Sequence, residues 1–231
     1  IPAPRVYADR SSDQKGEFGL DWVGPVGGTD VEMLFLQRLG HKSDINTSDD
    51  GTKSERFALK EDTNESILRA TMRYAPSAVL SAEGSVEADY NTLQGDSAYV
   101  RNGVAFAVPS ADAHVEERRG EIGGMVTWKI HPKWSLEAGV NTEYSLIKEP
   151  VGTGTATRSF LFPKPRVVLS WSPSKSAQVR MLVERRVGQI DFDDFVASSS
   201  FATSGVSAGN PDIQPDRRWR YRLSYERDFW E

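Results

Sequence analysis

Apolar and polar residues alternate with a period of two over most of this sequence, and this pattern restricts the fold more than any other feature. Between residues 80 and 91, one set of positions holds Ser, Glu, Asp and Asn, and the alternate positions are Leu80, Ala82, Gly84, Val86, Ala88 and Tyr90. A strand sends successive side chains to opposite faces, whereas a helix would mix the two sets around its axis. We therefore expect an all-β fold.

The same alternation marks further strands along the chain. It recurs clearly at 120–130, 136–146 and 219–226, and in shorter or noisier form at 17–23, 31–38, 66–74, 165–171 and 178–187. These segments predict about nine strands. Short and long connections alternate along the chain. The short ones contain Pro or Gly and lie near 24–30, 75–78, 131–134 and 172–177. The long ones are polar and lie near 39–64, 92–114, 148–158 and 188–216. We expect tight turns at one edge of the sheet and large loops at the other.

Composition excludes several classes of protein. The 231 residues include no cysteine, which excludes a disulfide scaffold and a cysteine nucleophile. The net charge is −5 and the arginines are dispersed among carboxylates, so we expect no nucleic-acid partner. No stretch approaches the ~20 apolar residues of a membrane helix. The first residues lack the basic start and apolar core of a secretory signal, and we interpret the sequence as a piece of a longer polypeptide.

One apolar and one polar face are found both in soluble sandwiches and in membrane barrels. Several alternating runs last about ten residues, which is the length a tilted strand needs to cross a bilayer. Short turns that alternate with long loops along the chain are typical of outer-membrane barrels. We therefore predict an antiparallel, up-and-down transmembrane β-barrel segment in the bacterial outer membrane, in contact with its lipid. A soluble β-sandwich binding module is an alternative.

Aromatic residues lie where this barrel would meet the membrane surface. An indole ring prefers the apolar side of the interface while its N–H reaches water. The expected interface aromatics beside the short turns or at the chain end are Trp22, Tyr74, Trp128, Trp134, Trp171 and Trp230. Tyr90 and Tyr144 lie at the opposite ends of their strands. Arg185 and Arg227 interrupt the apolar face, but both are near strand ends, where a long side chain reaches water.

The polar face carries complementary charges on neighbouring strands. A hairpin at 75–78 would bring Arg69 and Arg73 near Glu83 and Glu87, and the turn at 172–177 would similarly bring Arg166 towards Glu184. A wide barrel has a wet or plugged lumen that accepts such charges. We expect these residues to form solvated ladders without ligand contact.

Segment 209–216, with the sequence GNPDIQPD, resembles a Gly-Asn-Pro-Asp-Leu-x-Pro-Glu segment in the barrels of TonB-dependent outer-membrane receptors. An aromatic-rich strand follows it, as in that family. The upstream segments FPKPR (162–166), SWSP (170–173) and RRVGQIDFDDF (185–195) are similar to the proteobacterial branch of the family. The resemblance implies active import of a scarce nutrient such as a ferric siderophore, cobalamin or a glycan. It also implies a plug domain inside a 22-stranded barrel, which the TonB complex pulls.

This chain departs from the full family pattern. It contains no plug domain, no TonB box and no closing strand that ends in an aromatic residue, so residues 1–231 are expected to be part of the barrel domain only. The TonB complex would act through the missing plug region. A wall of about nine strands would not enclose a plug or transport by itself. A passive porin-like or structural outer-membrane barrel is the alternative within the membrane class.

If this chain recognises a ligand, we expect the large loops to do so, because function concentrates on connections held by a rigid scaffold. The candidate ligand-binding residues are Tyr99, Arg101, Asp193 and Asp194. Asp191, Asp193 and Asp194 could suit calcium. The interleaved Phe192 and Phe195 instead favour a loop that packs on its neighbours.

No enzymatic site is predicted, and no cofactor or metal. Residues 205–209 match Gly-x-Ser-x-Gly, but a nucleophile elbow needs a strand before it and a helix after it, which this segment does not indicate. His41, His114 and His131 fall in different expected connections, so we do not expect a shared metal or a catalytic triad.

Overall fold

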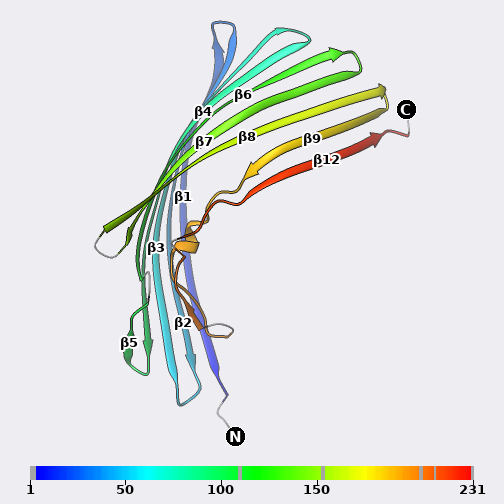
Figure 1. The fold of residues 1–231 in the computed structure, drawn as a ribbon. Coiled ribbons are helices and arrows are strands. Elements are labelled where there is room, and N and C mark those ends of the chain that lie inside the picture. The colour runs from blue at the N-terminus through cyan, green and yellow to red at the C-terminus, as the bar shows by residue number, and fades with distance from the viewer. Residues whose placement is uncertain (1–3, 109–110, 152–153, 203–204, 211, 230–231) are drawn as a thin grey trace.

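The fold is one curved antiparallel sheet of nine long strands (Figure 1). The computed structural model describes residues 4–108, 111–151, 154–202, 205–210 and 212–229. The long strands, in their order across the sheet, are β1 (Val6–Val26), β2 (Thr29–Asp49), β3 (Ser54–Ser77), β4 (Leu80–Arg101), β6 (Asp112–His131), β7 (Trp134–Val151), β8 (Gly154–Ser174), β9 (Ala177–Val187) and β12 (Arg217–Arg227). This order follows the chain, which confirms the predicted up-and-down topology.

Short elements complete the chain. β5 (Val104–Phe106) pairs with the end of β4, and β10 (Ser198–Ser200) pairs with β11 (Gly205–Ser207) in a separate small sheet. In the part of the chain that the structure describes, one 3-10 turn, η1 (Phe192–Phe195), precedes β10. Among the described residues, no helix is long and apolar enough to cross a membrane.

Tight turns join the strands at one end of the sheet, as predicted. Val26 pairs with Thr29, and the two residues between them, Gly27 and Gly28, have φ of 59° and 81°. A two-residue turn with positive φ at both central positions matches the twist of the flanking strands, and glycine suits both positions because it adopts positive φ without steric cost. The turns that follow β3, β6 and β8 lie at the same end of the sheet (Figure 1).

The prediction of a long loop is wrong at three of the four expected places, because the strands continue through them. β2 and β3 are 21 and 24 residues long and meet at a short turn at 50–53, inside the expected loop 39–64. Strand pairing likewise occupies most of 92–114 and 148–158. In these strand halves the outward face is polar and the apolar side chains, such as Phe57 and Leu59, lie on the inner face, so the period-two pattern changes phase while the strand continues. The connection at 188–216 is long, as predicted, and holds η1, β10 and β11.

One face of the sheet is apolar and uncovered, and we call it the outward face. Val86, Val140 and Leu223 lie on it and are 53%, 46% and 75% exposed. A soluble sandwich would bury these side chains under a second sheet. The described residues place no such layer over them, so the sandwich alternative is wrong and the barrel-wall prediction holds.

The buried core lies on the opposite, concave face, which we call the inner face. It occupies the half of the strands that is far from the tight turns, and its members are Phe57, Leu59, Leu93, Ala113, Val115, Ile147, Phe195, Val196, Ala197 and Phe201. The last four come from the connection after β9. The core therefore joins the sheet to that connection.

Candidate functional site

The inner face carries the ion pairs that the hairpins predict. Arg69 Nε donates to Glu87 Oε2 at 2.5 Å, and Arg73 Nε donates to Glu83 Oε2 at 2.8 Å. Arg166 Nε lies 3.6 Å from Glu184 Oε2. The three predicted pairings are therefore confirmed.

At the centre of the inner face, Arg119 of β6 joins the carboxylates of β4. Its Nε donates to Asp89 Oδ2 at 2.9 Å, and its Nη2 lies 3.4 Å from Glu87 Oε1. The side chains of Arg119 and Asp89 are 8% and 0% exposed. Loss of the guanidinium would leave a buried, unpaired carboxylate, so this pair fixes the β4–β6 register at its centre.

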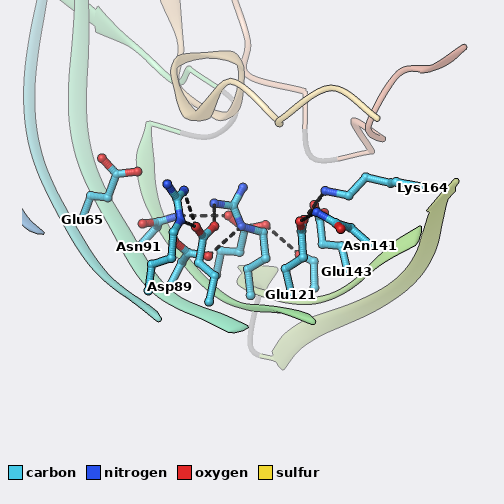
Figure 2. A network of polar contacts seen from close by, with 12 residues as sticks. Glu65, Asp89, Asn91, Glu121, Asn141, Glu143 and Lys164 are labelled. Atoms are coloured by element: carbon cyan, nitrogen blue, oxygen red, sulfur yellow. Dashed lines mark hydrogen bonds and ion pairs between the residues drawn. The ribbon is translucent and has the colours of Figure 1, made fainter. Parts of the chain in front are cut away.

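A chain of hydrogen bonds continues the polar surface across β6, β7 and β8 (Figure 2). Ser145 Oγ and Asn91 Nδ2 both donate to the Glu117 carboxylate, at 2.6 Å and 3.1 Å. Lys164 Nζ bridges Glu121 and Glu143, and it lies 2.9 Å from Glu143 Oε2. The inner face is thus largely self-neutralised, which suits a wall that faces water or another polar surface.

Residues 188–202 fold back over the inner face, and we call this segment the strap. Phe195 and Ala197 are 0% exposed, because they insert into the apolar core of the sheet. Ser199 Oγ also donates to Asn46 Oδ1 of β2 at 3.1 Å. The prediction that the interleaved phenylalanines mark a packed connection is confirmed for Phe195.

A cavity of about 480 Å³ lies between the strap and the inner face. The sheet contributes charged and amide groups from five strands, β1, β2, β3, β4 and β6, and the strap contributes a partly apolar roof. Its main lining residues are Arg38, Glu65, Asn91, Arg119, Gln189 and Phe192. Hydrogen-bonding walls with an apolar roof can hold a polar organic molecule.

A buried carboxylate lies under the strap. Glu61 of β3 is 5% exposed, and its Oε2 has no hydrogen-bond partner. Burial and the neighbouring carboxylate of Asp193 raise the pKa of Glu61 to about 7. Lys42 Nζ lies 3.6 Å from Asp44 Oδ2 and 3.7 Å from Asp193 Oδ2, so it partly offsets the repulsion. The contact between strap and sheet therefore contains a group that titrates near neutral pH.

The candidate ligand-binding residues are not gathered at one point. Tyr99 belongs to β4 instead of a loop, its hydroxyl donates to Glu55 Oε1 at 2.5 Å, and its ring packs on Phe201 of the strap. Arg101 is exposed at the end of β4. Asp193 and Asp194 lie in η1 on the strap. Their role in ligand binding stays a prediction.

Sequence reasoning missed the residues that line the cavity. Arg38, Glu65, Asn91 and Arg119 occupy inner positions of strands, and Gln189 opens the strap. One signal in the sequence could have found them. The connection at 188–216 is long, and a long connection that folds inward must contact the inner-face residues of the strands, so those positions were candidates for a lining.

The histidines lie in strands, contrary to the prediction that they fall in connections. His41 belongs to β2, and His114 and His131 belong to β6. Asp191, considered above for calcium, instead accepts a hydrogen bond from the backbone N–H of Asp193 and caps η1.

The expected interface aromatics lie on the outward face near the tight turns. Trp134 stacks on Trp171 with ring centroids 5.6 Å apart, and Trp128, Tyr74 and Trp22 are exposed on the neighbouring strands. Trp230 lies outside the described residues. Contact of these rings with the membrane surface stays a prediction.

Comparison by sequence gives no match to a family model or to a curated protein. Comparison by structure gives several matches. The chain is similar to the ferric yersiniabactin uptake receptor FyuA from Yersinia pestis, with a TM-score of 0.62 and 9% identity over 95% of this chain and 34% of that one. It is also similar to the siderophore receptor PiuA from Acinetobacter baumannii, with a TM-score of 0.60 and 11% identity over 96% of this chain and 38% of that one.

A third match is BauA, the ferric preacinetobactin receptor from Acinetobacter baumannii, with a TM-score of 0.59 and 12% identity over 96% of this chain and 35% of that one. The chain spans about a third of the length of each of these structures. At these identities the likeness concerns the fold, and it agrees with the compartment predicted from the sequence. The chain has the fold of a barrel wall of outer-membrane receptors.

Proposed function

We propose that this chain is part of the barrel of a TonB-dependent receptor, and that the whole protein imports an iron chelate of the siderophore class across the outer membrane. The observation that carries this proposal is the inner face, where a self-neutralised polar surface and an inward strap enclose a polar cavity. Among the solved structures that share the fold, FyuA is described as a ferric yersiniabactin uptake receptor, PiuA as a siderophore receptor and BauA as the ferric preacinetobactin receptor.

Each face of the wall has a part in this function. The outward face presents Val86, Val140 and Leu223 to acyl chains, which keeps the wall in the membrane. The inner face offers hydrogen bonds and paired charges to a hydrated lumen or a plug. The cavity under the strap has the amide and charged groups that could hold one part of a polar chelate.

The plug domain and the TonB box would belong to the rest of the polypeptide. In this proposal, β1 and β12 pair with further strands of the same protein, because long unpaired strand edges are unstable in lipid. The proposal therefore assigns wall structure and part of the ligand surface to this chain, and assigns energy transfer to the plug.

Uptake by cells tests the proposal. Cells that produce the full-length protein, and lack other iron-chelate receptors, would be given radioactive iron as catecholate, hydroxamate and citrate complexes in separate assays. We expect accumulation of at least one complex in cells with TonB, and loss of accumulation in otherwise identical cells without TonB. Accumulation that persists without TonB would indicate the passive barrel instead, and no accumulation of any complex would contradict the iron-chelate class.

A further inference from the structure

The floor of the cavity under the strap is one row of side chains that crosses five strands, and we call it the cavity floor. The strand register places Arg38 of β2 between Glu17 of β1 and Glu65 of β3. It places Asn91 of β4 between Glu65 and Glu117 of β6, and Figure 2 shows Glu65 and Asn91 on the sheet. Carboxylates therefore hold three of the five positions in this row, and Arg38 is its one cation.

The Arg38 guanidinium is paired on both sides. Its Nε donates to Glu17 Oε2 at 2.7 Å, and its Nη1 donates to Glu65 Oε2 at 3.0 Å. Lys15, an exposed cation of the cavity lining, is also paired, with its Nζ 2.9 Å from Asp13 Oδ2. An anionic ligand would have to displace these carboxylates before it could pair with either cation.

Arg119 is the third cation of the lining, and it is enclosed by acceptors. On the sheet it contacts the carboxylates of Asp89 and Glu87. From the strap, the Gln189 amide oxygen accepts from Arg119 Nη2 at 3.1 Å, in the amide orientation that satisfies both groups. The Arg119 side chain is 8% exposed. Its charge is therefore balanced within the wall, and its hydrogen bond to Gln189 ties the strap to the cavity floor.

The charges of the cavity lining cancel. Its charged residues are three cations and three carboxylates: Lys15, Arg38, Arg119, Glu17, Glu65 and Glu117. Among these described residues no cation is unpaired, so a multiply negative ligand would face the carboxylates without a free counter-charge. Repulsion between like charges is stronger in an enclosed space than in bulk water.

A neutral ligand would break none of these ion pairs. The amide groups of Asn91 and Gln189 can donate hydrogen bonds to it and accept them from it. Ile190 and Phe192 of the strap can pack on its methylene groups. The cavity therefore favours an uncharged ligand that combines amide groups with short apolar segments.

From this arrangement we infer that the cavity under the strap takes an uncharged iron chelate of the ferric trihydroxamate class. Three hydroxamate anions cancel the charge of Fe³⁺, and amide and methylene groups connect them. A ferric tricatecholate instead carries three negative charges, and ferric citrate complexes are also anionic. The inference rests on the proposed function, whose iron-chelate class it narrows to one charge type.

Equilibrium binding by the full-length protein tests this inference. Outer membranes from cells that produce the protein and lack TonB would be incubated with complexes of radioactive iron, so that binding is measured without transport. Ferrichrome and ferrioxamine E represent neutral trihydroxamates, and ferric enterobactin and ferric citrate represent anions. We expect at least one neutral complex to bind with a Kd at least about tenfold below that of either anionic complex.

Two variants of the cavity floor should shift this preference in opposite directions. Glu17→Gln combined with Glu65→Gln frees the Arg38 guanidinium, which can then pair with an anion. The Kd of the anionic complexes, divided by that of the neutral one, should fall at least about fivefold. Arg38→Gln leaves both carboxylates without their cation, and the same ratio should rise by a similar factor.

The matched control frees a second arginine of the inner face outside the cavity. Arg73 lies 2.9 Å from Glu32 and 2.8 Å from Glu83, and none of these three residues lines the cavity. Glu32→Gln combined with Glu83→Gln should therefore leave the ratio unchanged. Heat-dependent gel mobility would report that each variant is a folded barrel.

Equal or tighter binding of an anionic complex would overturn the inference, and so would the binding of neither neutral complex. In both cases TonB-dependent uptake of an anionic complex would leave the proposed function intact. A ratio that moves in neither cavity-floor variant, or that moves equally in the control, would also overturn the inference. Absence of uptake of every complex by cells would instead contradict the proposed function, and the inference with it.

Discussion

Replacement of Glu61 by Gln should keep the strap on the inner face at alkaline pH. Glu61 is buried beside Asp193, and its pKa is raised from 4.5 to about 7. The strapped state therefore holds a proton more tightly than a state in which the strap is released and Glu61 reaches water. Strap binding is strongest below pH 4.5, weakens as the pH rises through 7, and changes little above that.

The size of the effect follows from the same values. The pKa of Glu61 is 4.5 when it reaches water and about 7 under the strap. At about 1.4 kcal/mol for each pKa unit, ionisation of Glu61 weakens strap binding by about 3 kcal/mol. The population of the released state should then rise on the order of 50-fold between pH 5 and pH 8. Glutamine has no proton to lose, so the variant should show no such rise.

Cysteine labelling can measure the released state, because the chain has no cysteine of its own. Ala197 belongs to the strap and is 0% exposed where the strap packs on the sheet. A thiol at Ala197→Cys should therefore react with a maleimide only after the strap is released. The labelling rate of Ala197→Cys, divided by that of the same variant with Glu61→Gln, cancels the reactivity of the thiol itself. We expect this ratio to be about four at pH 5 and to rise by tens of fold between pH 5 and pH 8.

The matched control is Asp62→Asn, which removes a carboxylate at the next residue of β3. Asp62 points outward and pairs with His41, so it should not affect the strap. A ratio that stays near one at every pH would refute the reasoning, and so would an equal effect of Asp62→Asn.

Three further predictions concern the core, the inner face and the outward face. Phe195→Ala should weaken strap binding by about 3–5 kcal/mol, because it leaves a cavity in the core. Faster maleimide labelling at Ala197→Cys would report this loss, and Phe106→Ala, at an exposed position, is the control. Arg119→Met should lower the free energy of unfolding, measured in denaturant titrations, by about 3–5 kcal/mol, because it leaves the Asp89 carboxylate buried and unpaired. Adding Asp89→Asn should recover much of this loss. Additive losses from the two substitutions would contradict a coupled pair. Ile122→Arg, at a position that is 67% exposed, should cost about 2–4 kcal/mol in refolding into lipid vesicles, whereas a wall surrounded by water would lose almost nothing.

The sequence contains enough information to predict the strands where lipid and water lie on opposite faces. There the alternation at 80–91 fixes both the strand and the face of each residue. The hairpin at 75–78 then sets the register, so the Arg69–Glu87 contact could be predicted from spacing alone. Local turns therefore make inner-face contacts predictable between strands that a short connection joins.

The rest depends on contacts that spacing does not reveal. Residues 102–111, which include β5, separate β4 from β6, and no two-residue turn joins these two strands, so the position of Arg119 opposite Asp89 could not be read from the sequence. β2 and β3 run far past the apolar band, and there the buried apolar residues of β3, Phe57 and Leu59, lie on the inner face, so the alternation does not continue the pattern of 66–74. The strap was recognisable as a packed segment from Phe192 and Phe195, but its place against Phe57 and Leu93 follows only from the curvature of the sheet.

The central claim is that acyl chains lie against the outward face. Spin labels on single cysteines can test it in the full-length protein, reconstituted in lipid vesicles, at outward Val86, Val140 and Leu223 and at their inner-face neighbours Ser85, Asn141 and Ser224. Collisions with oxygen should dominate at the three outward positions, and collisions with a water-soluble nickel reagent should dominate at the three inner ones. Equal access of the nickel reagent to both sets would contradict it.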